Sequence, residues 1–486
     1  VQILPFRRLP AKARAKEKLM NKSLLMALSA IGFFLAGCSL IPEYEQPEKP
    51  VPAQWPTGSA YLAPGPQVPA ASELKWREFF SDEHLQRIIE TALQNNRDLR
   101  LSALNVERAR ALYGIQRAEL YPAVGAVATG GKQRQSIDLM QSGSARTKEQ
   151  YSVDLGVAAW ELDFFGRIRS LSEQALEEYL ASEEARRSAQ ISLIAEIARI
   201  YMALAADREN LQLARSTMDA QQASYALVKK RYDVGVTTEL DLKQAQIPLD
   251  TARRDVAIYT QLEAQDRNAL DLLAGVAVPD EWLPPNLGKV APPREVTAGL
   301  SSEALLRRPD IIAAEHRLKG AYASIGAARA ALFPRITLTT SIGTASNQLS
   351  GLFDSGTGTW AFTPQFVMPI FDARIWAALR VSKTDREIVL TQYEKTIQTA
   401  FREVADALAV QGTIGEQLAA QQSLTSAQAD RYRLATLRYT KGIDSYLGVL
   451  DAQRSYFAAQ QVLVALRLAN LSSQVRLYTV LGGGAE

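Results

Sequence analysis

The chain carries an internal duplication with a period of about 210 residues, and this feature restricts its fold more than any other. Residues 113–122 end in Arg-Ala-Glu-Leu-Tyr-Pro, and residues 325–334 end in Arg-Ala-Ala-Leu-Phe-Pro. Further along each copy, residues 231–246 resemble residues 438–453, and both stretches begin with Arg-Tyr followed by a nearby glycine. The shared order of these landmarks predicts that the chain folds as two copies of one unit.

Each copy predicts the same series of elements: a short helix, a strand hairpin, a long helix and a return helix. Pro122 and Pro334 should end the short helices, because a residue that precedes proline avoids the α region. Apolar and polar residues then alternate, as in 336–343, which indicates strands with one apolar face. Helix-forming sequence without proline follows from Gly166 to Tyr232 and from Ala373 to Tyr439, enough for roughly 100 Å of helix in each copy.

The fold class that we predict is α+β and mainly α, with an internal two-fold repeat. The predicted segments are an upstream extension 1–19, a signal peptide 20–37, an acylated N-terminus with a Pro-rich tether 38–75, a first repeat 76–285, a linker 286–300 and a second repeat 301–486. The expected hairpin, long helix and return helix lie at about 123–163, 166–234 and 237–274 in the first repeat, and at about 335–371, 373–441 and 443–481 in the second.

The N-terminus predicts a lipid anchor. A basic stretch and an apolar run too short for a permanent membrane span lead to Leu35-Ala36-Gly37-Cys38, which resembles a bacterial lipobox. This resemblance implies acyl chains on Cys38, and two or three chains anchor a protein stably. Ser39 in the next position, rather than Asp, favours the outer membrane by the same resemblance. The alternative is an ordinary free cysteine behind an uncleaved signal.

Composition argues against several other functions. Most of the basic excess lies in residues 1–37, so the rest of the chain is slightly acidic and nucleic-acid binding is not expected. The two histidines, His84 and His316, lie far apart, and no metal-binding or catalytic spacing is present, so we expect no catalytic residues, no metal and no cofactor beyond the acyl chains. His316 is expected on a helix surface.

The strand count predicts an oligomer. Four strands cannot close a barrel, and an open edge in lipid would leave backbone groups unpaired at a cost of several kcal/mol each. Three chains would supply twelve strands, enough for an open pore, whereas two would supply eight, whose interior side chains fill. We therefore predict a homotrimer. The alternative is a soluble sheet packed against the helices.

The lipobox, the duplicated hairpin and long helix, the repeated Tyr-x-x-Gly turns and several short motifs, among them residues 95–100 (Asn-Asn-Arg-Asp-Leu-Arg), carry a family resemblance. Residues 161–167 (Glu-Leu-Asp-Phe-Phe-Gly-Arg), 307–311 (Arg-Arg-Pro-Asp-Ile) and 450–455 (Leu-Asp-Ala-Gln-Arg-Ser) resemble the TolC-like outer-membrane efflux proteins, in particular their OprM-type lipoprotein branch. The resemblance implies a trimeric outer-membrane factor with a shared 12-stranded β-barrel in the outer membrane and a 12-helix α-barrel in the periplasm. It also implies a passive duct in a tripartite multidrug efflux system, with a periplasmic adaptor protein and an inner-membrane pump of the RND type.

The resemblance also places candidate site residues where the long helices turn. Leu447 and Asp451 would form the periplasmic gate, and they lie one turn apart on one helix face. Three such carboxylates would repel one another and favour cations. Asp241 would lock the gate by bonding across the tip to Arg438 or Tyr439. The plain alternatives are a packing leucine at 447 and solvated surface charges at the other positions.

The two turns between the helices would receive the adaptor in this family. Their residues are Val234, Gly235, Val236 and Thr237 in the first repeat, and Gly442, Ile443 and Asp444 in the second. Glycine at such a turn also has a local explanation, because a left-handed residue after a helix favours glycine regardless of partners.

Two other functions stay open on the sequence. The duct could export metal ions or secreted polypeptide, although one cysteine and six methionines offer no soft-metal relay for copper or silver. A lipid-anchored helical scaffold without a pore is the other alternative.

Overall fold

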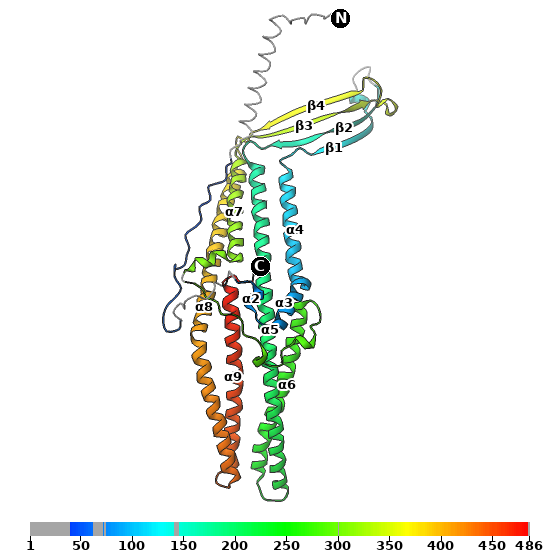
Figure 1. The fold of residues 1–486 in the computed structure, drawn as a ribbon. Coiled ribbons are helices and arrows are strands. Elements are labelled where there is room, and N and C mark those ends of the chain that lie inside the picture. The colour runs from blue at the N-terminus through cyan, green and yellow to red at the C-terminus, as the bar shows by residue number, and fades with distance from the viewer. Residues whose placement is uncertain (1–38, 62–70, 72–73, 140–144, 300, 485–486) are drawn as a thin grey trace, which may run out of the picture. The chain divides into compact units, whose positions relative to one another are not determined.

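The computed structural model describes residues 39–61, 71, 74–139, 145–299 and 301–484 (Figure 1). The predicted upstream extension, the signal peptide and Cys38 lie outside the described residues. The chain divides into two compact units, and each unit combines segments of both repeats. Unit 1 contains the described residues up to Gln46, Arg108–Tyr179 and His316–Leu390, and unit 2 contains Pro47–Glu107, Leu180–Glu315 and the described residues from Thr391 onward.

Unit 1 contains a four-stranded antiparallel sheet in the order β1-β2-β3-β4 (Figure 1). The strands are β1 Val124–Arg134, β2 Thr147–Leu162, β3 Arg335–Ser346 and β4 Gly358–Val367. Each repeat contributes one hairpin, and β2 pairs with β3 to join the two hairpins. The strands β1 and β4 are therefore the two outer edges of the sheet, each with one side not paired within the sheet.

The pairing register gives the sheet one apolar and one polar face. Directly paired residues of an antiparallel sheet lie on the same face. One row across the four strands consists of Ala126, Leu155, Ile342 and Trp360. The adjacent row, on the opposite face, consists of Gly125, Gly156, Ser341 and Ala361. The apolar face is open to solvent in the described chain, since Ile342 is 67% and Trp360 79% exposed.

A β-bulge in β2 keeps the apolar face continuous. Between Val157 and Trp160, β2 advances by one residue more than β3. Ala159 has a φ of 50°, and its N–H donates to Thr339 Oγ1 at 3.1 Å. Strict alternation would place Trp160 and Leu162 on the face opposite to Val157. Because of the extra residue, both pair with apolar residues of β3 and stay on the apolar face.

The helices follow the predicted series in both repeats. Their bounds are α2 Trp76–Phe79, α3 Glu83–Asn95, α4 Arg97–Ala118, α5 Arg167–Asp233 and α6 Glu239–Ala274 in the first repeat, and α7 Pro309–Ala330, α8 Ala373–Thr440 and α9 Tyr446–Val480 in the second. Short 3-10 helices are η2 Ile137–Leu139, η3 Asp280–Trp282, η4 Leu287–Lys289, η5 Ser302–Arg307 and η6 Leu349–Gly351. Among the described helices, α5 alone is long and apolar enough to cross a membrane, and most of its apolar stretch is buried.

A buried aromatic cluster and one carboxylate organise the core of unit 2. The rings of Phe79 and Tyr478 stack with centroids 3.8 Å apart, and the Tyr478 hydroxyl donates to the Leu74 carbonyl at 2.7 Å. Asp82 caps α3 by accepting from two backbone N–H groups at 3.0 Å. Its carboxylate also accepts from the hydroxyl of Tyr201 on α5 at 3.2 Å. These contacts attach the start of the first repeat to α9 through Tyr478 and to α5 through Tyr201.

The Pro-rich tether is extended and binds to the second repeat. In unit 1, the ring of Tyr44 packs edge-on against Tyr322 of α7, with centroids 5.5 Å apart. In unit 2, Trp55 stacks on Phe401 of α8 at 5.3 Å. The described part of this segment therefore runs along the helices, and ring contacts hold it where backbone pairing is scarce.

Candidate functional site

The turns between the long helices and the return helices share one backbone structure. In the first turn, the N–H of Val236 donates to the carbonyl of Arg231 at 2.9 Å, and in the second, the N–H of Ile443 donates to Arg438 at 3.0 Å. Gly235 has a φ of 76° and Gly442 a φ of 74°. Both turns are Schellman motifs, which require a left-handed residue and therefore favour glycine.

The helices that leave the two turns differ in their N-terminal capping. Thr238 and Asp241 form a complete capping box at the start of α6, because each side chain binds the backbone N–H of the other residue. Three hydrogen bonds from Thr237 and Thr238 lower the pKa of Asp241. The N-cap residue of α9 is Ser445, whose side chain makes no capping bond, and Gly448 occupies the place of Asp241 in the repeat. The two return helices therefore begin with unequal stability.

Replacing Thr238 with alanine should make the first turn of α6 open more easily. Loss of the cap removes the bond to the N–H of Asp241, and we expect amide hydrogen exchange in this turn to become about fivefold faster. Hydrogen exchange followed by mass spectrometry measures the change. The matched control is Ser445→Ala at the equivalent position of α9, where exchange should not change because that side chain makes no cap.

The expected lock between Asp241 and Arg438 or Tyr439 is not formed in the described chain. Arg438 pairs with Asp444, with Nε 2.5 Å from Oδ2. The Tyr439 hydroxyl accepts from Arg231 Nη1 at 3.0 Å. Arg438 and Tyr439 therefore bind other residues, and the Asp241 carboxylate accepts hydrogen bonds from Thr237 and Thr238. The bond from Arg231 to Tyr439 connects the ends of α5 and α8, a contact that the sequence analysis missed because its residues are 208 positions apart.

The candidate gate residues lie on α9, and Asp451 is ion-paired. Arg431 Nη2 of α8 lies 2.5 Å from Asp451 Oδ2, and Arg454 Nη2, one turn along α9, lies 2.8 Å from Oδ1. Both arginines lower the pKa of Asp451, Arg431 more strongly, so the carboxylate is ionised at neutral pH. The side chain of Leu447 is exposed. Within the described chain, two guanidinium groups offset the charge of Asp451, and the repulsion among three such carboxylates stays a prediction.

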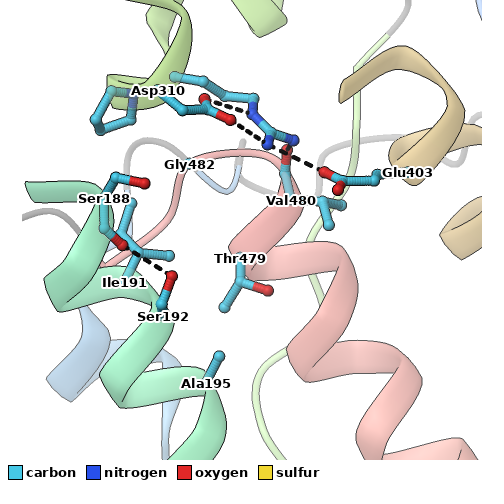
Figure 2. Close-up of a pocket in the computed structure, with 11 residues that line it drawn as sticks. Ser188, Ile191, Ser192, Ala195, Asp310, Glu403, Thr479, Val480 and Gly482 are labelled. Atoms are coloured by element: carbon cyan, nitrogen blue, oxygen red, sulfur yellow. Dashed lines mark hydrogen bonds and ion pairs between the residues drawn. The ribbon is translucent and has the colours of Figure 1, made fainter. Parts of the chain in front are cut away.

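A second charged cluster in unit 2 explains the motif at 307–311. Arg308 Nη2 lies 2.7 Å from Asp310 and 3.0 Å from Glu403, and Nη1 donates to the Val480 carbonyl at 2.7 Å (Figure 2). The cluster borders a cavity of about 310 Å³. Because Arg308 joins the start of α7 to α8 and to the end of α9, its role in the described chain is structural.

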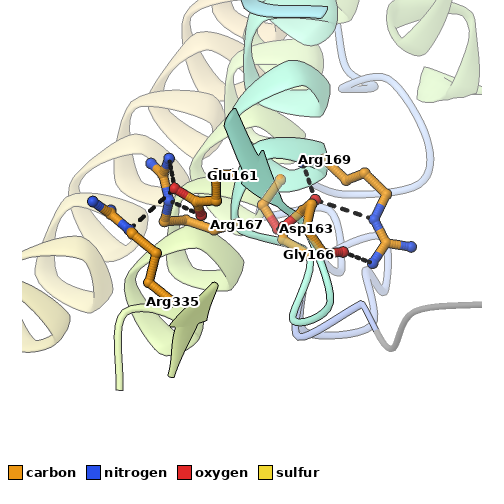
Figure 3. A network of polar contacts seen from close by, with 7 residues as sticks. Glu161, Asp163, Gly166, Arg167, Arg169 and Arg335 are labelled. Atoms are coloured by element: carbon orange, nitrogen blue, oxygen red, sulfur yellow. Dashed lines mark hydrogen bonds and ion pairs between the residues drawn. The ribbon is translucent and has the colours of Figure 1, made fainter. Parts of the chain in front are cut away.

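The motif at 161–167 forms the junction between sheet and helix in unit 1. Glu161, near the end of β2, accepts from Arg167 at the start of α5 at 2.8 Å and lies 3.0 Å from Arg335 of β3 (Figure 3). Asp163 pairs with Arg169 at 3.2 Å, and its side chain also accepts the Arg169 N–H. These paired charges fix the direction in which the helix leaves the strand.

No group of three or more His, Cys, Asp or Glu residues that could hold a metal occurs in the described part of the chain. His316 binds Glu177 through Nδ1 at 2.6 Å, and its side chain is only 20% exposed. The expectation that His316 lies on a helix surface is therefore wrong, because a carboxylate of α5 packs over it.

One acid in unit 2 has an unusual pKa. Burial raises the pKa of Asp207 on α5 to about 6, and the neighbouring carboxyl of Asp266 on α6 adds to the rise. A carboxyl group whose pKa is higher in the folded than in the unfolded state destabilises the fold when it is ionised. The penalty is complete above about pH 6 and disappears as the pH falls toward 3.8.

Asparagine in place of Asp207 should therefore stabilise the protein at neutral pH. We expect the melting midpoint of Asp207→Asn to exceed that of the wild type by a few degrees at pH 7.5 and to approach it at pH 4. Melting curves of the purified protein at a fixed scan rate measure the difference. Asp219→Asn, an exposed position on the same helix, is the control. An advantage that is equal at both pH values would contradict the assignment.

Comparison with known proteins agrees with this architecture. The family model described as outer membrane efflux protein matches residues 88–276 and 300–483, one stretch in each repeat. The chain is 50% identical over 466 residues to the antibiotic efflux pump outer membrane protein ArpC of Pseudomonas putida and to the toluene efflux pump outer membrane protein TtgC of the same species, with 96% of each chain covered.

A solved structure shares the fold as well. The crystal structure of the open state of the Neisseria gonorrhoeae MtrE outer membrane channel matches with a TM-score of 0.82 and 38% identity, and the match covers 92% of this chain and 99% of that one. The family model matches both repeats, and relatives and a solved structure match over nearly the whole chain. This chain therefore belongs to the outer membrane efflux protein family.

Proposed function

We propose that the protein is the outer-membrane exit duct of a tripartite efflux system and that it works as a homotrimer. The two-faced sheet with two unpaired edges is the observation that carries the proposal. In lipid, an apolar face can point outward, but open edges cannot persist because their backbone groups would lack partners. Pairing β4 of one chain with β1 of the next would close a twelve-stranded barrel from three chains, with the polar face lining the pore.

Acyl chains on Cys38 would anchor the protein to the outer membrane. The described tether beyond this position binds along the second repeat, so the anchored end would stay attached to the folded body. The test is labelling with a radioactive fatty acid, which Cys38→Ser should abolish. Retained label would contradict the lipobox assignment.

The two helical turns would contact a periplasmic adaptor, and an inner-membrane pump of the RND type would supply energy. The side chains of Val234, Val236 and Ile443 are between 61% and 74% exposed, although each is apolar. Apolar side chains held on rigid Schellman turns suit a partner that buries them. Gly235, Thr237, Gly442 and Asp444 would hold the turns in shape.

Leu447 and Asp451 would form the gate of the duct. Arg431 and Arg454 would act with Asp451, because both ion-pair with its carboxylate. A lock from Asp241 to Arg438 or Tyr439 would require these side chains to leave Asp444 and Arg231, their partners within the chain.

The cargo would be antibiotics, solvents and other amphipathic compounds, which the names of the relatives suggest. The duct would perform no chemistry on them. The proposal is tested by deleting the gene, measuring susceptibility to chemically different compounds, and recording conductance of the purified protein in planar bilayers. Unchanged susceptibility together with absence of conductance would overturn it.

A further inference from the structure

A cavity of about 270 Å³ lies in unit 2 between α6 and α9, with part of α5 as its third wall. Its lining is mainly apolar and includes Ile247, Pro248, Leu447, Leu450 and Phe457. Leu447 and Asp451 form only one border of this space. Passage of cargo through a duct does not require such a cavity.

Two residues that line the cavity have an acceptor without its usual donor. Pro248 lies inside α6 and has no amide N–H, so the carbonyl of Gln244, four residues earlier, loses its helical partner. Gln244 lines the cavity, as does Gln221 of α5. Gln221 is 4% exposed, and its Oε1 has no hydrogen-bond partner in the described structure. A buried acceptor without a donor, such as Gln221 Oε1, is unfavourable, and a ligand that donates a hydrogen bond would relieve this cost.

The two carboxylates at the cavity are ion-paired. Asp451 is paired with Arg431 and Arg454, and the carboxylate of Asp255 with Arg254 at 2.6 Å. Since each of these charged side chains already has an ion-pair partner, none of them calls for an ionic ligand. The volume of about 270 Å³ limits the size of the ligand. A cavity of about 150 Å³ accommodates benzene, whereas drug-sized ligands need about 300 Å³ or more.

We propose that this cavity binds a small neutral aromatic molecule of one or two rings that carries a hydrogen-bond donor. The apolar walls take up the rings, and the donor reaches Gln221 Oε1 or the Gln244 carbonyl. The cavity lies next to the proposed gate residues Leu447 and Asp451, and binding of the molecule does not depend on whether the chain conducts.

Binding of 1-aminonaphthalene to the purified full-length protein tests the proposal. Equilibrium dialysis measures its affinity, with 1-methylnaphthalene as a probe of similar size that has no donor. Ile247→Trp places a large ring at the exposed wall of the cavity and should fill it. The probe that this variant still binds measures the nonspecific uptake by detergent and lipid. Ile258→Trp on the same helix, outside the cavity lining, is the matched control.

The wild type and Ile258→Trp should bind 1-aminonaphthalene at least tenfold more tightly than Ile247→Trp. Gln221→Met, which keeps the length and removes the acceptor, should weaken this binding several-fold without weakening that of 1-methylnaphthalene. Gln222→Met, whose side chain bonds Arg253 instead, should change neither. Leu450→Trp gives a second way to fill the cavity if Ile247→Trp does not fold.

The proposal is overturned if the wild type binds 1-aminonaphthalene no better than the filled variants. It is also overturned if the two probes bind equally well and Gln221→Met affects neither. Conductance is measured separately, so a failure of the duct proposal leaves this result unaffected, and the reverse holds as well.

Discussion

Arginine in place of Ile342 should abolish assembly of the protein in the outer membrane, whereas arginine in place of Ser341 should leave assembly intact. The two residues are neighbours on β3 but belong to opposite faces of the sheet. On a lipid-facing surface, an arginine near the middle of the bilayer costs about 2–4 kcal/mol. In the proposed trimer, three copies would then cost about 6–12 kcal/mol, which is comparable with the whole stability of many folded proteins.

The amount of folded oligomer in the outer-membrane fraction measures this effect. Ser341 pairs with Gly156 and Ala361, so small neighbours leave room for the added side chain on the polar face. Ser341→Arg should change the ion selectivity of the pore instead. Equal assembly of both variants would argue against the lipid-facing assignment of the apolar face.

Alanine in place of Asp451 should increase the conducting fraction of channels on the order of tenfold. The carboxylate connects α8 with α9 through Arg431 and is shared with Arg454. Single exposed ion pairs contribute little, but removal of this residue breaks two pairs at once in each of three proposed subunits. Loss of the connection between the helices should favour an open arrangement.

Single-channel recording of purified protein measures the conducting fraction. Asp430→Ala is the matched control, because Asp430 pairs with Arg433 of the same helix at 3.4 Å and connects no other helix. Arg431→Ala should act in the same direction, and the double variant should add little to either. Because the pKa of Asp451 is lowered, its pairing is complete above its unfolded pKa near 3.8 and is lost only as the pH falls through its lower folded value. The wild-type gate should therefore behave alike at pH 7 and pH 5.

Much of the fold could be predicted from local sequence. The long helix predicted at 166–234 is α5, Arg167–Asp233, in the structure. The long helix predicted at 373–441 is α8, Ala373–Thr440. These boundaries depend on proline, glycine and capping residues, whose effects act within a few positions. The polar and apolar alternation likewise predicted the two faces of the strands up to Val157.

The partners of the site residues could not be predicted in the same way. Arg454 lies three positions from Asp451 on one helix, so its pairing was open to a sequence argument. Arg431 is 20 residues away on another helix, and Arg231 is 208 residues from Tyr439. The expected lock at Asp241 failed within the chain because nearby threonines compete for the same carboxylate.

The sequence by itself determined the duplication, the order of elements and the glycine turns, because periodicity and backbone preferences are local properties. Only the tertiary structure decided how the two copies differ in their strand pairing and helix packing. The bulge at Ala159 keeps Trp160 on the apolar face, and Pro248 borders a cavity that exists only where α6 meets α9. Both features depend on which segments pack together, and pairing between distant segments leaves no local periodicity in the sequence.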